Sequence, residues 1–284
     1  MIPAQFDYLR ARSVDEAVTA LGEHGDDAKV LAGGQSLIPL LRLRLSYPEV
    51  LVDVGPVAEM RGVRENGDHL VIGAMTTHYD VIHHPLVRQH AGLIAEATEK
   101  VADPAVRHRG TFGGSVAHAD PAADLPAVAR ALDAELVIAG SAGRRTVPAS
   151  EFFVDYLQTA IQPDEVLVEV RVPRLGAGWG YRYEKFTRVA QAWAVVAVAA
   201  AVRRDNGTIA EARIALSNMG ATPVRASGVE EALTGATPEA IAGAAERAAE
   251  GTNPPSDLNG KSDYREHLAR VLTRRAVTAA AGEG

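Results

Sequence analysis

The chain contains no cysteine among its 284 residues. It therefore forms no disulfide, offers no thiol nucleophile and holds no zinc or iron–sulfur centre through cysteine. Any redox chemistry must use an organic cofactor or a centre on another subunit. Positive charge is not in excess either, because the net charge is −7, which argues against nucleic acid as the main partner.

Long apolar segments are also missing. The most apolar stretch, residues 192–202, has 11 residues and is too short to cross a bilayer as a helix. The first residues lack the basic start and apolar run of a signal peptide. We therefore predict no membrane span and a cytoplasmic location. With 47% hydrophobic and 23% charged residues, a chain of this length is expected to form two or three structural units.

Two glycine loops stand out once the common nucleotide motifs have been excluded. Neither the G-x-G-x-x-G fingerprint nor the Gly-Lys-Ser/Thr end of a P-loop is present. Paired glycines allow positive φ angles and a close backbone approach, and successive amides solvate phosphate oxygens. Together the loops predict one site for a large anionic ligand with two phosphates, and the alternative is that both are only tight turns. The loops are Ala32-Gly33-Gly34-Gln35-Ser36 and Thr111-Phe112-Gly113-Gly114-Ser115, the second preceded by Arg107-His108-Arg109-Gly110.

The first half of the chain predicts α/β organisation. Ser13 and Glu16 form a capping box before an apolar stripe at helical spacing, and Gly25 follows its end. A strand at 29–31 leads into the first glycine loop, as expected for a ligand site at the end of a strand. Asp120 and Pro121 fit the N-cap and first position of a helix that continues to Ala131. Other expected elements are a helix or edge segment at 37–45, a helix at 85–101, and strands at 50–54, 69–73, 135–139, 144–147 and 166–172.

The last part of the chain predicts a separate domain. Gly176-Ala177-Gly178 is the best linker candidate, and Asp205-Asn206-Gly207 is a strong hairpin turn. We expect units at 1–57, 58–176 and 177–284, the last an antiparallel sheet with helices. Its expected strands are 180–188, 191–203 and 208–217, and its expected helices are 224–233, 238–250 and 264–278.

Several histidines invite a metal interpretation, but none forms an HxxxH-type pair with a carboxylate at ligand spacing. No metal site is therefore predicted. His118 and Asp120 flank the second loop and are assigned to a turn in preference to the ligand site. The histidines considered are His78, His83, His84, His108 and His118.

Two other residues each allow two interpretations, and a third, Lys185, has one default. Asp124 either accepts hydrogen bonds from ribityl or ribose hydroxyls or offsets the dipole of its helix. Lys185 lies within a strand, where an exposed lysine is the default. Trp193 heads an alanine- and valine-rich strand, where it either packs in the core or stacks on an aromatic ring.

Taken together, these residues resemble the FAD-binding medium subunit of molybdenum hydroxylases, the carbon monoxide dehydrogenase and xanthine dehydrogenase family. The resemblance runs nearly end to end. This sequence departs from the family at three positions. Gln35 stands where some relatives have histidine, Phe112 where isoleucine or valine is common, and Ser115 where asparagine is found. None of these changes removes the backbone amides of the two loops. The motifs are A-G-G-x-S at 32–36, T-x-G-G-[NS] at 111–115, Asp120-Pro121-Ala122-Ala123-Asp124-Leu125-Pro126, Tyr183-Glu184-Lys185-Phe186 and Ser262-Asp263-Tyr264-Arg265-Glu266-His267-Leu268.

The resemblance implies an α+β fold: a vanillyl-alcohol-oxidase (PCMH)-type FAD-binding domain of two α/β subdomains, and a C-terminal antiparallel-sheet-and-helix domain. It implies that both loops wrap the FAD pyrophosphate, largely through backbone amides. Asp124 would bond the ribityl or flavin region, Lys185 would lie beside the isoalloxazine, and Trp193 would cover one of its faces. The implied FAD contacts are Val30, Leu31, Ala32, Gly33, Gly34, Gln35, Ser36, Leu37, Val101, Thr111, Phe112, Gly113, Gly114, Ser115, Asp124, Leu167, Lys185 and Trp193.

The resemblance also implies partners and a role. A large subunit would carry the molybdenum cofactor and a small subunit two [2Fe–2S] clusters, assembled as a dimer of heterotrimers. This chain would accept electrons from the small subunit on FAD and pass them to an external acceptor, with no catalytic acid, base or nucleophile of its own. One alternative is a self-contained FAD-dependent oxidoreductase of the same fold. Another is an interaction protein whose glycine loops are only turns.

Overall fold

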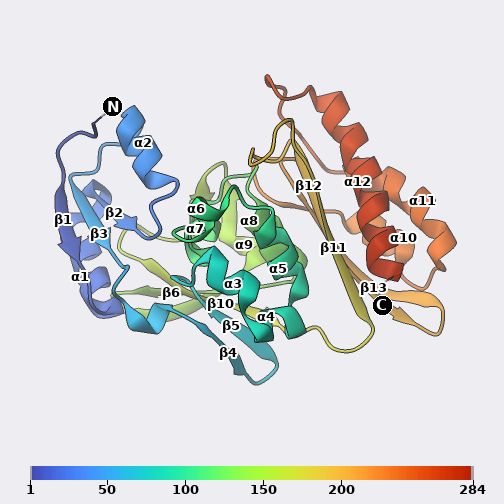
Figure 1. Cartoon of the computed structure of the whole chain (residues 1–284), viewed down its shortest axis with the longest axis horizontal. Helices are drawn as coiled ribbons and strands as arrows, with labels where there is room; N and C mark the ends of the chain where they lie inside the picture. Colours follow the sequence, from blue (N-terminus) through green and yellow to red (C-terminus); the bar gives the residue numbers. More distant parts are fainter. Residues whose placement is uncertain (1, 283–284) are drawn as a thin grey trace.

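The computed structural model describes residues 2–282, which form three main sheets that follow one another along the chain (Figure 1). The first sheet is parallel, in the order β1-β3-β2. Ser13 caps the first helix as expected, since its Oγ accepts from the Glu16 amide at 3.1 Å. The Glu16 carboxylate accepts from the Arg12 amide, one residue before the position that a capping box predicts. The elements are β1 (Asp7–Arg10), α1 (Val14–His24), β2 (Ala28–Leu31), α2 (Leu37–Leu43) and β3 (Val50–Asp53), with 3₁₀ turns at Gly25–Asp27 and Ala58–Met60.

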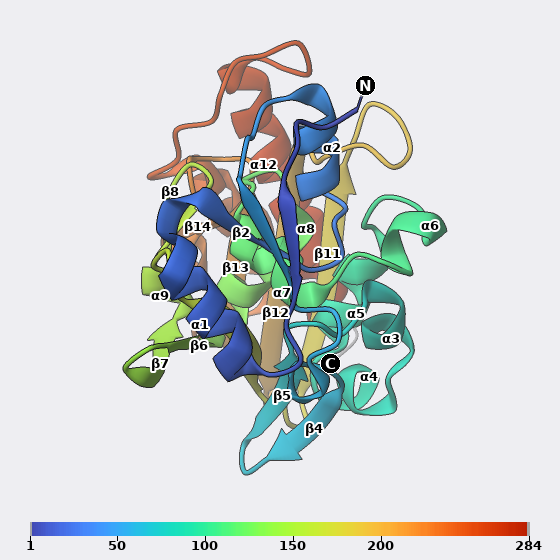
Figure 2. The same cartoon turned by 90° about the vertical axis from the view of Figure 1, so that its left-hand side faces the viewer.

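The second sheet is antiparallel, in the order β4-β5-β10-β6-β7, and carries helices between its strands. In the view of Figure 2, the parallel sheet lies in front of α7 and α8 of this unit. The strands are β4 (Val63–Asn66), β5 (His69–Gly73), β6 (Glu135–Gly140), β7 (Gly143–Pro148) and β10 (Val166–Pro173), and a small hairpin joins β8 (Phe153–Asp155) to β9 (Gln158–Thr159). The helices are α3 (His78–His83), α4 (Pro85–His90), α5 (Gly92–Glu99), α6 (Pro104–Arg107), α7 (Phe112–His118), α8 (Asp124–Ala131) and α9 (Ala149–Phe152).

The third sheet is antiparallel, in the order β11-β12-β13-β14, and α12 packs along it (Figure 1). Asn206 and Gly207 adopt positive φ angles of 48° and 85°, as the predicted hairpin requires. The elements are β11 (Trp179–Phe186), β12 (Val196–Asp205), β13 (Thr208–Ser217), β14 (Val224–Arg225), α10 (Ser227–Leu233), α11 (Ile241–Ala245) and α12 (Ser262–Gly282), with 3₁₀ turns at Pro238–Ala240 and Glu246–Ala249. Among residues 2–282, no helix is long and apolar enough to cross a membrane.

Strand β12 is buried on both faces. Ala197, Ala199 and Ala201 belong to the core shared with the first two sheets. Val196 and Val198 belong to the core beneath α10, α11 and α12. These three alanines therefore face the neighbouring helices α5 and α8, and the valines, with Ala200, face the C-terminal helices.

Several helix predictions are wrong in their bounds. The predicted helix at 85–101 breaks at Ala91, where φ is −149°, and a Cβ on the following Gly92 would clash with the ring of Tyr181. The region 224–233 begins as a strand, because Val224 pairs with Leu216 of β13. The region 238–250 is a short helix between two 3₁₀ turns.

The predicted helix at Asp120 begins instead at Asp124. Pro126 has no N–H, so a helix starting at Pro121 would leave the carbonyl of Ala122 without its donor four residues later. Ala194 donates to that carbonyl at 3.3 Å, and Asp120 closes a local turn by accepting from the Ala122 amide.

Candidate functional site

The two glycine loops lie against each other. A Cβ on Gly33 would clash with the carbonyl oxygen of Arg109 and would lie 2.8 Å from Cα of Gly110, so only glycine fits there. A Cβ on Gly114 would lie 3.6 Å from Cβ of Ala32 in the first loop. The structure thus brings together two segments that are far apart in the sequence.

The loops differ in the groups they present. Among residues 2–282, no acceptor takes the amides of Gly33, Gly34, Gln35 or Ser36, and Gly34 has a φ angle of 74°. The side chain of Gln35 turns back and donates to the Gly33 carbonyl at 3.2 Å. Four successive free amides in one loop are an arrangement that suits phosphate oxygens.

The second loop uses its amides internally. The Phe112 and Gly113 amides donate to Thr76 and Ala74 carbonyls, each at 2.9 Å, and the Gly114 amide donates to Thr111 Oγ1 at 3.1 Å. Thr111 is therefore the N-cap of α7. The second loop accordingly offers side chains and a close-fitting wall, and the first loop offers the free amides.

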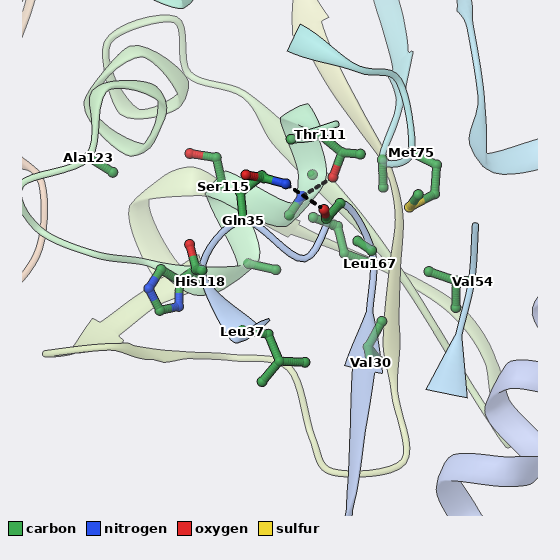
Figure 3. A pocket seen from close by; sticks show the side chains of 18 of the residues that line it. Val30, Gln35, Leu37, Val54, Met75, Thr111, Ser115, His118, Ala123 and Leu167 are labelled. Carbon is green, nitrogen blue, oxygen red and sulfur yellow. Dashed lines mark hydrogen bonds between the residues drawn. The ribbon is translucent and has the colours of Figure 1, made fainter. Parts of the chain in front are cut away.

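A cavity of about 650 Å³ lies between the loops, the end of β10 and the segment before β12. Figure 3 shows Gln35, Thr111 and Ser115 near its centre, with Val30, Val54 and Leu167 nearby. The predicted residues that line it are Val30, Ala32, Gly33, Gln35, Ser36, Leu37, Val101, Thr111, Gly113, Gly114, Ser115, Asp124, Leu167, Lys185 and Trp193. Leu31, Gly34 and Phe112 do not line it: Gly34 turns the first loop, and Phe112 is fully buried in the core.

The apolar part of the wall comes from strand ends. Leu167 of β10 is 4% exposed, and Val30 of β2 packs against the same core. Ile161, Gln162 and Gln191 also line the cavity. Sequence patterns did not single out these three residues, because each lies in an irregular segment without a recognisable motif.

His78 lines the cavity from the first position of α3. Its side chain is 4% exposed, and Nδ1 has no hydrogen-bond partner within residues 2–282. Burial lowers the pKa of His78 to about 4, and the charge of Arg107 acts in the same direction. The ring is therefore a neutral part of the wall near pH 7. No specific sequence pattern indicated this role, because His78 was considered only among the histidines tested as metal ligands.

At the other end of the cavity, Asp124 is held by two residues of β11. Its Oδ1 accepts from the Tyr183 hydroxyl at 2.7 Å, and its Oδ2 pairs with Lys185 Nζ at 2.9 Å. Lys185 also donates to the Lys100 carbonyl at 3.1 Å. Its side chain is 7% exposed, so the default of an exposed strand lysine is wrong.

Burial raises the pKa of Asp124, while the charge of Lys185 and the bonds from Tyr183 and Lys185 oppose this rise. The pKa of Tyr183 lies well above its ordinary value, first because of burial and then because of the Asp124 charge. The phenol therefore remains a donor at neutral pH. The carboxylate and ammonium at this cavity wall form a buried ion pair.

Trp193 lies outside the strand it was expected to head. β12 begins at Val196, and Gln191 turns the preceding segment with a φ angle of 68°. The Trp193 side chain is 58% exposed and borders the cavity, so the core-packing interpretation is wrong.

The histidines are spread over the site and its surroundings. The Tyr79 ring stacks on His108 and packs at a tilt against His83, each with ring centroids 4.2 Å apart. His118 lines the cavity, and Asp120 does not. Residues 2–282 contain no group of three or more His, Cys, Asp or Glu side chains placed to hold a metal ion.

These features fit FAD. Cofactor sites typically occupy about 300–1,000 Å³, and this cavity has about 650 Å³. The free amides of the first loop match a pyrophosphate, and the apolar strand ends match the body of a large organic molecule. The Asp124–Lys185 pair offers both an acceptor and a donor to a polar ring or ribityl chain.

Comparison with known proteins identifies both parts of the chain. Residues 4–175 match the FAD binding domain in molybdopterin dehydrogenase, and residues 181–280 match the CO dehydrogenase flavoprotein C-terminal domain. The carbon monoxide dehydrogenase medium chain of Hydrogenophaga pseudoflava is 44% identical, with 99% of this chain and 98% of that protein covered. Subunit alpha of the 6-hydroxypseudooxynicotine dehydrogenase complex of Paenarthrobacter nicotinovorans is 38% identical, with 99% and 96% covered.

Solved structures agree with this assignment. A chain of the Hydrogenophaga pseudoflava carbon monoxide dehydrogenase that lacks the Mo-pyranopterin moiety superposes with a TM-score of 0.97 at 45% identity, with 99% of both chains covered. The α+β fold implied by the resemblance is thereby confirmed. The chain belongs to the family of FAD-binding medium subunits of molybdenum hydroxylases of the carbon monoxide dehydrogenase type.

Proposed function

We propose that this chain is the FAD-carrying medium subunit of a heterotrimeric molybdenum hydroxylase, which takes electrons from a small iron–sulfur subunit and passes them to an external acceptor. The observation that carries this proposal is the row of free amides from Gly33 to Ser36, in a loop whose residues Gly33, Gln35 and Ser36 line a cavity of cofactor size. The absence of cysteine is consistent with it, because any iron–sulfur cluster ligated by cysteine must then lie on another subunit.

The roles of the residues follow from their positions. The first-loop amides would hold the pyrophosphate, with Ser115 adding a hydroxyl from the second loop. Lys185 and Asp124 would contact the polar part of the ring system or the ribityl chain, and Trp193 would cover the ring. Three residues that do not line the cavity, Leu31, Gly34 and Phe112, would act by shaping the loops. The remaining proposed contacts are Val30, Ala32, Gln35, Leu37, Val101, Thr111, Gly113, Gly114 and Leu167.

When bound, FAD supplies the redox chemistry. The chain itself binds and orients the cofactor, and we propose no acid, base or nucleophile from its residues. The two relatives are named for carbon monoxide and for 6-hydroxypseudooxynicotine, which are chemically unlike. We infer that the substrate is selected on another subunit.

The assembly follows from the same proposal. A large molybdenum-cofactor subunit and a small subunit with two [2Fe–2S] clusters would join this chain, as a dimer of heterotrimers in the cytoplasm. Within the chain, residues 1–57 and 58–176 would form the two FAD-binding subdomains, and residues 177–284 the C-terminal domain.

Affinity purification of the tagged full-length chain from its own cells tests the proposal. We expect FAD, molybdenum and iron to co-purify, and the bound flavin to be bleached when substrate is added to the assembly. The isolated chain, loaded with FAD, should not be reduced by organic substrates. Reduction without partners would support the self-contained oxidoreductase, and absence of FAD from both preparations would contradict the proposal.

A further inference from the structure

The segment before α8 is held by the C-terminal sheet. Three successive carbonyl oxygens accept hydrogen bonds from residues of the third unit. These bonds come from structure that is more than 70 residues away in the sequence. The pairs are Pro121 with the Asn218 amide at 2.7 Å, Ala122 with the Ala194 amide at 3.3 Å, and Ala123 with Ser217 Oγ at 3.0 Å.

The side chain of the next residue, Asp124, also accepts hydrogen bonds from the C-terminal unit. Tyr183 and Lys185 are alternate residues of β11, so their side chains leave the same face of the strand. One binds Oδ1 of Asp124 and the other binds Oδ2. The C-terminal unit therefore holds both the backbone just before Asp124 and the Asp124 carboxylate, which the FAD-binding domain contributes to the cavity.

Tyr183 differs from its two partners. Asp124 and Lys185 line the main cavity, whereas Tyr183 does not. Its side chain is 2% exposed, and its hydroxyl is the only hydrogen-bond partner of Asp124 Oδ1 within residues 2–282. A buried carboxylate without such a donor favours its neutral form.

We infer that Tyr183 is a positioning residue of the cofactor site, which keeps Asp124 ionised and oriented so that Asp124 and Lys185 present their remaining bonding sites to the ligand. The inference rests on the proposed FAD site. An ionised carboxylate has about four lone-pair sites, so it can accept from a ligand hydroxyl while Tyr183 and Lys185 occupy the others. The FAD site is thus complete only with the C-terminal domain in place.

The test is Tyr183→Phe in the full-length chain, with Tyr156→Phe as a matched control because Tyr156 is 65% exposed on the β8–β9 hairpin. FAD dissociation constants are measured by calorimetry between pH 5 and pH 9. We expect Tyr183→Phe to weaken FAD binding about tenfold or more near pH 6, since hydrogen bonds to charged groups contribute strongly. The pH below which affinity falls should move upward by about one unit. Tyr156→Phe should match the wild type.

An equal loss of affinity at every pH would show that the Tyr183 hydroxyl does not keep Asp124 ionised, and it would overturn the inference. So would an unchanged profile. A second measurement needs no cofactor: ¹³C titration of the Asp124 carboxyl in the FAD-free chain. Its pKa should rise in Tyr183→Phe and stay constant in Tyr156→Phe. A wild-type chain that binds no FAD contradicts the proposed function, and the carbon titration then decides the role of Tyr183.

Discussion

The buried His78 makes the stability of the FAD-free chain depend on pH in a defined window. Its pKa is about 4 in the folded chain and about 6.5 in an unfolded one. Below pH 6.5 the unfolded state binds a proton that the folded state excludes, so stability falls as pH falls towards 4. The linkage corresponds to about 2.5 kcal/mol lost at pH 4.5 and almost none at pH 7.5.

His78→Gln removes the titrating group, and His267→Gln, on the exposed surface of α12, serves as the matched control. Urea unfolding at pH 7.5 and pH 4.5 gives the free energy of unfolding for each chain. We expect the wild type and His267→Gln to lose about 2 to 3 kcal/mol more than His78→Gln between these pH values.

Equal losses in all three chains would refute the reasoning. They would show that the imidazole gains a proton at no cost, and therefore that the wall around it is wetter than the structure indicates. A larger loss in His78→Gln would contradict the sign of the linkage.

Two further substitutions test the packing of the loops and of the C-terminal helix. Gly33→Ala forces the first loop away from Arg109 and should weaken FAD binding about tenfold or more in a fluorescence titration. Gly22→Ala, at a position of α1 where a Cβ meets no other atom, is the control. It should leave FAD binding unchanged and raise the free energy of unfolding by about 0.5–1 kcal/mol. Equal FAD affinities for Gly33→Ala and Gly22→Ala would contradict the proposed site. Arg265→Leu removes a fully buried guanidinium that donates to the Val195 carbonyl. It should lower the free energy of unfolding in urea by about 2–4 kcal/mol, and Arg265→Lys should lower it less. A loss below about 1 kcal/mol for Arg265→Leu would contradict this account.

Local chemistry explains which parts of the fold could be predicted from sequence. The cap at Ser13 and the turn at Asn206-Gly207 depend on neighbouring residues only, so their patterns were sufficient. The two glycine loops were recognisable for the same reason. The contact between the two loops, where Gly33 lies against Arg109 and Gly110, is not specified by neighbouring residues in the sequence. It was expected only because both loops were predicted to bind the same ligand.

Long-range partners explain the errors. Whether a helix begins at Asp120 or at Asp124 depends on donors from the third sheet, which sequence patterns do not reveal. The burial of Lys185 depends on Asp124, which is 61 residues away. The alanines and valines that follow Trp193 are typical of a buried strand, and so predicted that Trp193 belongs to it. The chain turns at Gln191 and the strand begins only at Val196, which leaves Trp193 outside it.

Strand β12 has a consequence for how the molecule unfolds. Ala197, Ala199 and Ala201 serve one core, whereas Val196, Val198, Ala200 and Val202 serve the other, so neither core survives intact if this strand leaves the sheet. We therefore expect the second and third units to open as one cooperative block, despite the glycine linker at 176–178 that separates them in the sequence. Insertion of a single residue at the start of β12 would exchange the faces of the residues after it, placing Val198 and Val202 against α5 and α8. One strand thus fixes the register of two hydrophobic cores.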